Sequence, residues 1–359
     1  MPADVRFAQW TLAVCLTAAS ASLVEGCSIP DAPAAMVEEE PDARTLYASH
    51  RRGATFFNPW AEMTTGFTDL LRWKLSRNEF SEAKRRTPDV PRVANDGSTL
   101  LADLEDPSVT WIGHATALVE DEGDVWLTDP IFSDSIFGLR ERLHPPGIPL
   151  ERIPPPRFVV VSHNHYDHLD APTIEALPGS TVMVVPLGLG DWMRDAGREQ
   201  VTELDWWQST LVGDWTITCL PSQHWSLRTL DRNETLWASW LVEGHGRRYY
   251  FAGDTGYFPG FAEYGRRFGP IDVALLPIGA YAPRWFMAYQ HMDPAQALTA
   301  FAELGARWMV PIHWGTFDLS DEPMDEPPRE LARVAASRPE LGERIKVLAI
   351  GETFHLPSG

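Results

Sequence analysis

The stretch FVVVSHNHYDHLD, residues 158–170, decides how the rest of the chain can be interpreted. Its first four residues are apolar and mostly β-branched, which is typical of a short buried strand. The nine residues that follow include three histidines and two aspartates. The cluster therefore begins where a strand ends and a loop starts, which is where α/β folds place their chemistry.

The HxHxDH motif within this stretch can offer four metal ligands from one tight loop, namely His163, His165, Asp167 and His168. Borderline-soft divalent metals such as zinc favour imidazole nitrogen and carboxylate oxygen. A surface loop that collects histidines by chance is the alternative, and the residues downstream argue against it.

Three later side chains share the placement of this motif. His224, Asp254 and His313 each come directly after an apolar run that predicts a strand. A hydrophobic core has no reason to collect unpaired His and Asp, because burying them without partners is costly. The seven side chains exceed what one tetrahedral zinc ion uses, and they suit two ions about 3.5 to 4 Å apart.

From about residue 109 the chain alternates predicted strands and helices, which indicates an α/β layered domain. We expect a hairpin turn over 121–124 and helices over 188–196 and 294–304. The expected strands cover 109–112, 118–120, 125–127, 158–161, 181–185, 215–220, 237–242, 248–252, 273–277 and 308–312. Cys219 is the one cysteine of this region and is most simply a small buried apolar side chain.

The chain resembles the metallo-β-lactamase fold superfamily in the order of its motifs. The HxHxDH motif comes first, followed by a single histidine, the aspartate of GDTG and a histidine at the end of a strand. The resemblance implies a four-layer αβ/βα sandwich with an N-terminal extension, and two zinc ions per chain between the sheets. It also implies a partition in which His163, His165 and His224 hold one ion, Asp167, His168 and His313 hold the other, and Asp254 bridges them.

A more specific resemblance rests on longer motifs and runs from about residue 56 to the C-terminus. The chain is similar to the phospholipase D family that hydrolyses N-acylphosphatidylethanolamine. The motifs that carry this resemblance are FFNPW near the N-terminus, then SHNHYDHLD, ELDWW, LPSQHW, FAGDTGY, PIGAYAPRWFM, YQHMDP and IHWGTF. This implies a zinc-dependent phosphodiesterase that releases N-acylethanolamine and leaves phosphatidic acid. A metal-bridged hydroxide would attack phosphorus, with Asp254 and Asp167 among the catalytic residues.

Other side chains are candidates for supporting roles. Asp129 and His114 are expected to orient the zinc ligands through hydrogen bonds, with ordinary strand-end structure as the alternative. His291, with Gln290 beside it in YQHMDP, is expected to contact phosphate and to take part in catalysis. Arg228 is a candidate substrate contact at the site entrance, and a solvated charge is the other interpretation.

An aromatic-rich loop contains Tyr281, Trp285, Phe286 and Met287. It could line an acyl pocket, which makes Tyr281 a candidate substrate contact. Aromatic side chains in such loops also serve as core residues, and the sequence leaves both interpretations open.

The charge of the chain is strongly acidic overall but uneven. A formal net charge of −20 argues against a nucleic-acid partner, because phosphate binding needs basic surface. Residues 44–92 nevertheless hold ten Lys or Arg against five Asp or Glu. A helix expected over 66–77 carries Arg72, Lys74 and Arg77 beside helically spaced apolar residues. It either packs on the core or meets an anionic bilayer.

The N-terminus predicts export to the cell envelope. Residues 7–24 are apolar or small without charge, which fits a signal peptide over 1–27 better than a spanning helix. Gly26-Cys27 resembles a lipoprotein processing site, although Glu25 departs from its pattern, so a periplasmic location with a lipid anchor through Cys27 is expected. Residues 28–105 are predicted to form a tether and a basic amphipathic arm, and 106–359 the hydrolase domain.

The expected partner is a phospholipid substrate at a membrane surface, and a homodimer is a candidate assembly. Two alternatives stay open at this point. The first is a dizinc hydrolase acting on another phosphodiester, a lactone or a cyclic phosphate sugar ester. β-Lactams are disfavoured because Asp254 stands where that branch commonly offers Cys. The second is a non-catalytic envelope lipoprotein that zinc stabilises, which seven ligands argue against because structural zinc usually takes four.

Overall fold

The computed structural model describes residues 43–102 and 107–357. These described residues form one compact unit. The predicted signal over 1–27, with Cys15 and Cys27, lies outside the described residues and stays a prediction. Among the residues that are described, no helix is both long and apolar enough to cross a bilayer.

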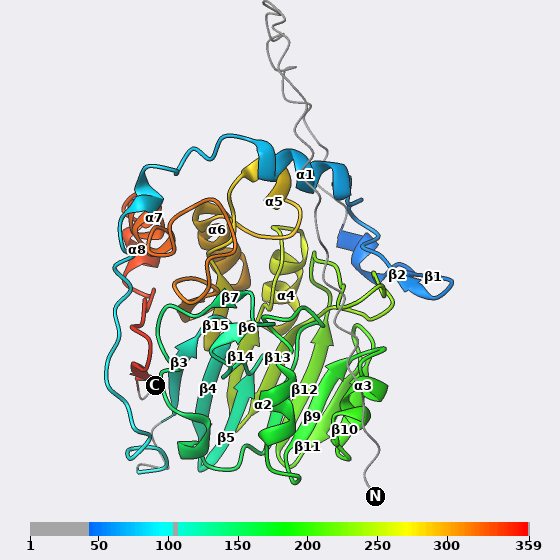
Figure 1. The fold of residues 1–359 in the computed structure, drawn as a ribbon. Coiled ribbons are helices and arrows are strands. Elements are labelled where there is room, and N and C mark those ends of the chain that lie inside the picture. The colour runs from blue at the N-terminus through cyan, green and yellow to red at the C-terminus, as the bar shows by residue number, and fades with distance from the viewer. Residues whose placement is uncertain (1–42, 103–106, 358–359) are drawn as a thin grey trace, which may run out of the picture. The chain divides into compact units, whose positions relative to one another are not determined.

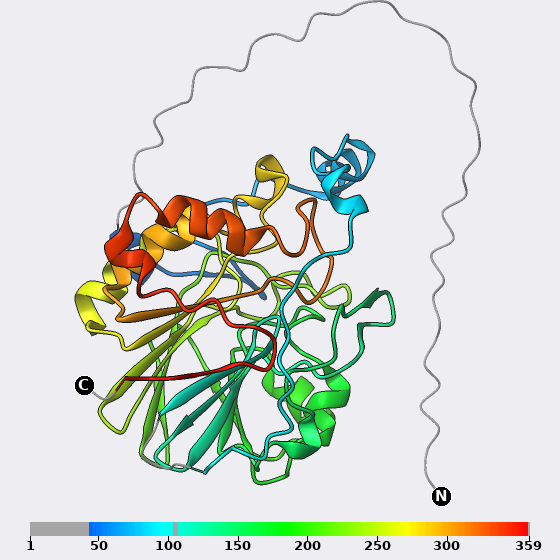
Figure 2. The ribbon, with the colours of Figure 1, turned by 90° about the vertical axis from the view of Figure 1, so that its left-hand side faces the viewer.

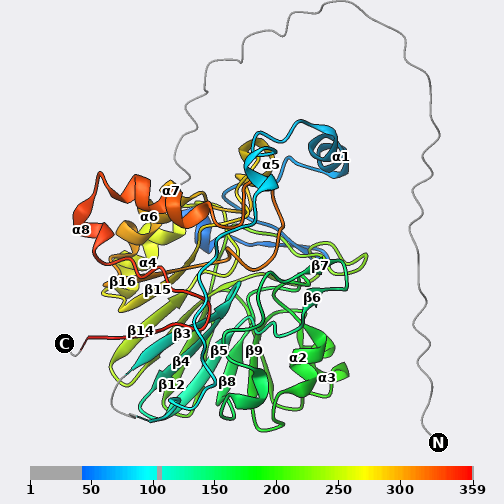
Figure 3. The ribbon, with the colours of Figure 1, turned by 60° about the vertical axis from the view of Figure 1, so that its left-hand side comes forward.

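Two β-sheets lie face to face at the centre of this unit, and helices cover the outer side of each (Figure 1, Figure 3). The first sheet has seven strands in the order β10-β9-β8-β5-β4-β3-β17, and the second has six in the order β11-β12-β13-β14-β15-β16. Helices α2 and α3 lie outside the first sheet, and α4, α6, α7 and α8 lie outside the second (Figure 3). The predicted four-layer αβ/βα sandwich is confirmed.

The strands of the first sheet are β3 (Ser108–Gly113), β4 (Thr116–Asp121), β5 (Asp124–Thr128), β8 (Phe158–Val160), β9 (Val182–Pro186), β10 (Val201–Leu204) and β17 (Thr353–His355). Those of the second are β11 (Ser209–Val212), β12 (Trp215–Leu220), β13 (Ser239–Gly244), β14 (Arg247–Phe251), β15 (Val273–Pro277) and β16 (Trp308–Ile312). Two small ribbons add β1 (Arg51–Arg52) with β2 (Thr55–Phe56), and β6 (Ser135–Ile136) with β7 (Arg140–Glu141). All predicted strands are present.

The helices are α1 (Phe67–Leu75), α2 (Ala171–Ala176), α3 (Gly190–Asp195), α4 (Gly260–Phe268), α5 (Arg284–Met287), α6 (Pro294–Leu304), α7 (Pro327–Ala335) and α8 (Pro339–Gly342). Short 3₁₀ turns cover 43–47, 83–85 and 150–152. The best-specified helix is α6. Asp293 and Gln296 form a capping box at its start, and Gly305 ends it in a left-handed conformation.

Tight turns and aromatic packing fix how the strands pair. Glu122 and Gly123 both have positive φ, 48° and 84°, as the type I′ hairpin turn between β4 and β5 requires. Between the sheets, Trp126 of β5 lies 6.1 Å from Trp215 of β12, measured between ring centroids. Both are fully buried. Burying a side chain of this size is worth about 5 kcal/mol before entropy is subtracted.

The segment before the sandwich packs against it rather than standing apart. After α1 the chain runs along one side of the sheets (Figure 1, Figure 2). There the backbone of Arg92 forms an isolated parallel β-bridge with that of Ile350. The guanidinium of Arg86 donates two hydrogen bonds to Asp325, at 2.6 and 2.8 Å. Helix α1 contacts α5 through Trp73, which packs on Phe286. The described part of the predicted arm is thus integral to the fold.

Candidate metal centre

The sheet topology gathers the candidate residues at one edge of the sandwich. Asp129 follows β5 and His163 follows β8, and these two strands pair in parallel. His224, Asp254 and His313 follow β12, β14 and β16 of the second sheet. These strands share one direction, because β12 and β14 both pair antiparallel with β13 while β14, β15 and β16 pair in parallel. Residues far apart in sequence therefore converge.

The first cluster consists of His163, His165, His224 and Asp254, whose ligand-type atoms all lie within 4.8 Å of one another. Nδ1 of His165 is 2.8 Å from Nε2 of His163 and 3.3 Å from Nε2 of His224. Three imidazole nitrogens this close in a buried place suit a cation between them.

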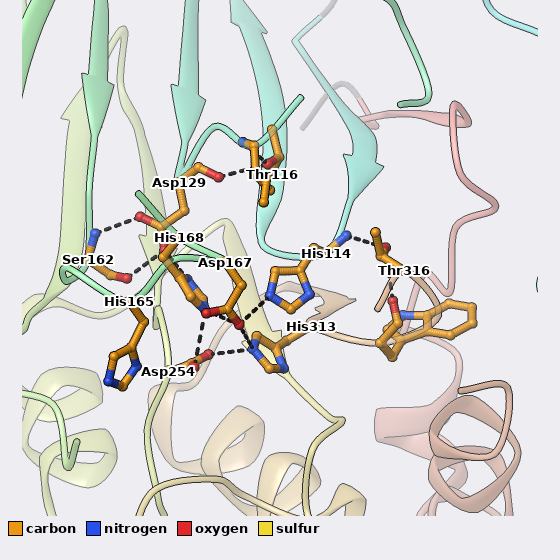
Figure 4. Close-up of polar contacts among 12 residues, drawn as sticks. His114, Thr116, Asp129, Ser162, His165, Asp167, His168, Asp254, His313 and Thr316 are labelled. Carbon is orange, nitrogen blue, oxygen red and sulfur yellow. Dashed lines mark hydrogen bonds and ion pairs between the residues drawn. The ribbon is translucent and has the colours of Figure 1, made fainter. Parts of the chain in front are cut away.

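The second cluster consists of His114, Asp167, His168 and His313, again with ligand-type atoms within 4.8 Å. Oδ2 of Asp167 lies 3.5 Å from Nε2 of His168 and 3.7 Å from Nε2 of His313 (Figure 4). His114 also contacts this carboxylate, and its Nε2 lies 3.0 Å from Oδ2 of Asp167.

Asp254 lies between the two clusters. Its Oδ2 is 3.9 Å from His163 Nε2, 3.8 Å from His224 Nε2 and 3.1 Å from His168 Nε2. Its Oδ1 is 3.1 Å from Nε2 of His313. One carboxylate thus faces both halves of the site, as the predicted bridging role requires.

The polar atoms of this site fit divalent metal ions. Among the described residues, His168 Nε2, His313 Nε2, Asp254 Oδ1 and His291 Nδ1 are buried without a well-aligned hydrogen-bond partner. Leaving such atoms unsatisfied would cost about 1–3 kcal/mol each. Imidazole nitrogens and carboxylate oxygens converging from several strands are the donor set that zinc and similar metals take.

Three of the histidine rings, those of His163, His168 and His224, are held by hydrogen bonds at their other nitrogen. His168 Nδ1 is 2.6 Å from Oδ2 of Asp129, which also accepts the Ser162 hydroxyl at 2.5 Å (Figure 4). That hydroxyl lies 2.8 Å from Nδ1 of His163, and Nδ1 of His224 lies 3.0 Å from the carbonyl oxygen of Gln290. These contacts fix the rings with Nε2 directed into the site.

Three site residues adopt left-handed backbone conformations. The φ angles are 54° at His114, 30° at Asp129 and 61° at His313. Non-glycine residues adopt such angles rarely, and each costs of order 1–3 kcal/mol that the surroundings must offset. The His313 N–H donates to the His114 carbonyl at 2.9 Å, and the His114 N–H donates to Thr316 Oγ1 at 2.6 Å (Figure 4). The strained backbone is held where the ligands are presented.

The first cluster holds its histidines neutral. Burial lowers the pKa of His163 and His224 well below the ordinary value, and lowers the pKa of His165 to about 4. Neutral imidazole is the form that coordinates metals, so this cluster needs no deprotonation at neutral pH.

The second cluster concentrates negative charge. Burial disfavours charge on His168 and His313, but the nearby carboxylates of Asp254 and Asp167 outweigh it. They raise the pKa of His168 well above its ordinary value and that of His313 to about 9. Burial likewise opposes the two carboxylates, yet the imidazoles around them hold the pKa of both well below the usual range. Two neighbouring carboxylates that stay ionised attract cations.

A cavity of about 590 Å³ opens onto both clusters. Polar site residues form one part of its wall, namely His165, Asp167, His224, Asp254, His291 and His313. Apolar side chains of α1 and α5 form another part, namely Phe67, Leu70, Trp73, Phe286 and Met287. The site therefore joins a polar end to an apolar chamber.

The remaining predicted residues fall in different places. His291 and Gln290 are buried in the cavity wall, with His291 Nδ1 3.9 Å from Asp254. Arg228 also lines the cavity, but its guanidinium donates to the carbonyls of Asn164 and Leu169 in the ligand loop. Tyr281 is buried with its hydroxyl against Glu326 and is not among the cavity-lining residues.

The sequence did not single out several residues that support the site. Ser162 links Asp129 to His163, and its position directly before the HxHxDH motif could have indicated this role. Asn58 of the FFNPW motif donates to the His224 carbonyl at 2.9 Å and accepts from the Trp237 indole at 3.0 Å. Nothing in the local sequence indicates that the N-terminal segment lies beneath a ligand.

Comparison with known proteins agrees with this geometry. A family model described as a beta-lactamase superfamily domain matches residues 126–314. The chain is 41% identical over 341 residues to an N-acyl-phosphatidylethanolamine-hydrolyzing phospholipase D of Caenorhabditis elegans, covering 88% of this chain and 94% of that one. It is 39% identical over 347 residues to an uncharacterized protein of Mycobacterium tuberculosis, covering 90% and 91%.

Solved structures share the fold at lower identity. A metallo hydrolase from Ignicoccus hospitalis has a TM-score of 0.55 at 23% identity, covering 71% of this chain and all of its own. An isothiocyanate hydrolase from Delia radicum gut bacteria has a TM-score of 0.57 at 20% identity, covering 69% and 99%. This chain therefore belongs to the metallo-β-lactamase superfamily and is a metal-dependent hydrolase of that fold.

Proposed function

We propose that this protein is a zinc-dependent phosphodiesterase of the phospholipase D type, which hydrolyses N-acylphosphatidylethanolamine to N-acylethanolamine and phosphatidic acid. The observation that carries this proposal is the cavity. Five of the seven predicted ligands line its polar end, His163 and His168 complete the two clusters beside them, and α1 and α5 give the cavity apolar walls. A lipid phosphodiester has the same division into a charged head and apolar chains.

The apolar walls favour a lipid over a soluble diester. Phe67, Leu70 and Trp73 of α1 face the cavity together with Phe286 and Met287 of α5. A soluble phosphodiester or a cyclic phosphate would leave these walls in contact with water, at about 25 cal/mol for each Å² of apolar surface left uncovered. The relative from Caenorhabditis elegans, matched along most of both chains, supports the same substrate class.

The chain's own residues assemble and orient the site. His163, His165 and His224 would hold one ion, Asp167, His168 and His313 the other, and Asp254 would contact both. When bound, two zinc ions supply Lewis acidity at a phosphoryl oxygen and activate water near neutral pH. Asp129, Ser162 and the Gln290 carbonyl keep the rings in one tautomer and orientation.

Two further features of the chain act on the substrate. His291 presents an unpartnered Nδ1 to the cavity beside Asp254, from where an imidazole can hydrogen-bond a phosphoryl oxygen. The apolar side chains of α1 and α5 exclude water around the reacting group, which strengthens electrostatic interactions inside the cavity. Export through the signal predicted over 1–27 would place the enzyme beside its substrate in the cell envelope, and sequencing the mature N-terminus checks that step.

Metal analysis of the purified protein, combined with mass spectrometry of products from N-acylphosphatidylethanolamine vesicles, tests the function. We expect about two zinc ions per chain and the release of N-acylethanolamine with phosphatidic acid. Asp254→Asn should lose metal and turnover together, whereas Asp195→Asn, an exposed residue at the end of α3, should keep both.

Three outcomes would contradict the proposal. Activity on a soluble phosphodiester with none on the vesicles would favour the second substrate class. Unchanged turnover after complete metal removal would exclude the metal from the reaction. Full activity of Asp254→Asn with unchanged zinc content would refute the bridging role.

A further inference from the structure

We propose that the rim of the cavity is a docking face for an anionic lipid bilayer. The face consists of the outer side of α1, the tip of the β6–β7 ribbon (residues 137–139), Trp285 of α5 and the loop around Leu230. The inference deepens the proposed function, because it names the surface that meets the bilayer, but its test uses no substrate.

Large apolar side chains on this face are exposed to solvent. Phe67 and Leu75 of α1 are 79% and 78% exposed, and Phe137 and Leu139 of the ribbon tip are 70% and 78% exposed. Leu230 is 98% exposed. Scattered exposed leucines are ordinary in soluble proteins, but a group of them on neighbouring segments marks an interaction surface.

The cavity shows that these segments form one rim. Phe67 and Leu70 of α1, Ile136 of the ribbon and Arg228 and Arg232 of the Leu230 loop all line it. Phe67 is both exposed and cavity-lining, and the other exposed residues lie on the same segments as residues that line the cavity. Helices α1 and α5 lie together beyond the ends of the sheets (Figure 3). A lipid entering from a bilayer on this side would pass the apolar rim before it reached the metal clusters.

Basic groups are interleaved with the apolar ones. Residues 66–77 hold Arg72, Lys74 and Arg77 against the single acidic Asp69, whose carboxylate caps the start of α1. Arg72 lies over the ring of Trp285, with its guanidinium carbon 4.7 Å from the ring centroid. An arginine and a tryptophan held together suit the headgroup layer, where one end of each contacts water and the other contacts apolar material.

These cations keep their charge available. The carboxylates that act on Lys74 are engaged elsewhere, because Asp321 accepts the Trp73 indole N–H at 3.0 Å and Asp318 pairs with Lys84. Within residues 43–102 and 107–357, no ion pair joins Arg72, Lys74, Arg77, Arg140 or Arg232 to a carboxylate. Free basic groups beside exposed apolar groups are what an anionic bilayer binds.

The charge of the rest of the molecule orients the docking. The chain carries a formal net charge of −20, so an anionic bilayer repels most of its surface. Only the basic rim can approach, and it carries the mouth of the cavity. The apolar groups project from four separate segments, as a soft bilayer can accommodate.

Co-sedimentation of the full chain with vesicles free of N-acylphosphatidylethanolamine tests this face. Wild-type protein should bind vesicles of phosphatidylcholine with phosphatidylglycerol, bind pure phosphatidylcholine weakly, and lose binding as salt rises. Leu75→Asp should weaken binding to the anionic vesicles by at least ~10-fold. Arg77→Glu should weaken it by roughly five-fold or more.

Two matched variants serve as controls. Leu211→Asp changes a leucine that is 73% exposed on β11, and Arg152→Glu reverses an exposed charge at the 3₁₀ turn over 150–152. Both should bind like wild type, and thermal unfolding should show that all four variants fold. None of the four residues lines the cavity, so turnover of a detergent-dispersed substrate should be unchanged.

The proposal is overturned if Leu75→Asp and Arg77→Glu bind anionic vesicles like wild type, or if neutral and anionic vesicles bind equally. Equal losses in the control variants would also overturn it. Because the vesicles contain no substrate, these outcomes do not depend on whether the proposed reaction is correct. If the protein bound anionic vesicles as expected but did not hydrolyse N-acylphosphatidylethanolamine, the docking face would stand and only the proposed reaction would be refuted.

Discussion

His291 is the imidazole in the cavity wall that is left over once the seven predicted ligands are assigned. Its Nδ1 is buried without a partner and lies 3.9 Å from Asp254. We expect His291→Gln to reduce kcat about 100-fold, because one hydrogen bond to the developing charge on phosphate is lost. Metal content should be unchanged, as measured by metal analysis. A variant that loses metal in proportion to activity would make His291 a ligand instead.

Arg228 is better described as a positioning residue than as a free substrate contact. Its guanidinium carbon lies 4.3 Å from the ring centroid of Tyr166 and 4.9 Å from that of Trp192, and the group donates to the carbonyls of Asn164 and Leu169, at 3.2 and 2.8 Å. These carbonyls lie within or next to the loop that carries His165, Asp167 and His168. The guanidinium therefore fixes the loop at both ends.

Arg228→Lys should consequently weaken metal affinity about ten-fold, because lysine keeps the charge but not the planar fork. Titration of the metal-free protein with zinc or cobalt measures the change, and the cobalt absorption spectrum reports the ligand geometry. Arg232→Lys is the matched comparison, since Arg232 makes no hydrogen bond to that loop. Equal affinities in the two variants would assign Arg228 to the substrate alone.

At the scale of elements, the N-terminal segment is part of the metal centre. The side chain of Asn58 donates to the His224 carbonyl and to the Tyr289 hydroxyl, and accepts from Trp237. Asn58→Ala should lower the free energy of unfolding by about 1–3 kcal/mol, because buried polar groups lose their partner. It should also weaken zinc binding, since His224 loses its support.

Urea unfolding and zinc titration measure the two effects of Asn58→Ala. Asn78→Ala serves as the control, because Asn78 bonds the Asp321 carbonyl and the Phe80 N–H away from the ligands. It should cost stability without changing zinc affinity. If both variants behave alike, the segment stabilises the fold only.

Asp325 joins the same segment to α7, and it predicts a pH dependence of stability. Burial would raise the pKa of this carboxyl, but hydrogen bonds from Arg329 and Arg86 outweigh burial and hold the pKa well below its usual range. A depressed pKa means that the contribution is complete above the unfolded value of about 3.9 and is lost as pH falls below it.

Wild type should therefore be more stable than Asp325→Asn at pH 7 and at pH 5, with a difference that shrinks below about pH 4. Urea unfolding at several pH values, with a chelator present in both samples, measures the difference without a contribution from metal binding. A difference as large at pH 2 as at pH 7 would show that the carboxylate's charge is not the cause.

At the same scale, periodicity and turn chemistry made the central elements predictable. Helix α6 has the predicted bounds because its capping box and its C-terminal glycine are local signals. The edge strand β17 could not be predicted in this way, since its three residues form a strand only by pairing with β3. Helix α4 was missed although Phe261, Tyr264 and Phe268 follow a helical period, so that signal was present in the sequence.

At the scale of the whole molecule, the metal centre was predictable because each ligand follows a strand, and parallel strands end at the same edge. The partition of ligands came from family resemblance, and the geometry is consistent with it. The apolar chamber was not predictable. It depends on α1 meeting α5 across about 200 residues of sequence, and no local pattern reports such a contact.

The basic rim has a kinetic consequence if the enzyme works on a bilayer. The proposed reaction turns a phosphodiester with a single negative charge into a phosphate monoester, which carries about −1.5 to −2 at pH 7. Each turnover would make the lipid patch under the enzyme more negative and retain it more firmly. Progress curves on vesicles should then accelerate after a lag, and vesicles preloaded with phosphatidic acid should abolish the lag. The product of one catalytic event would thus recruit the catalyst for the next.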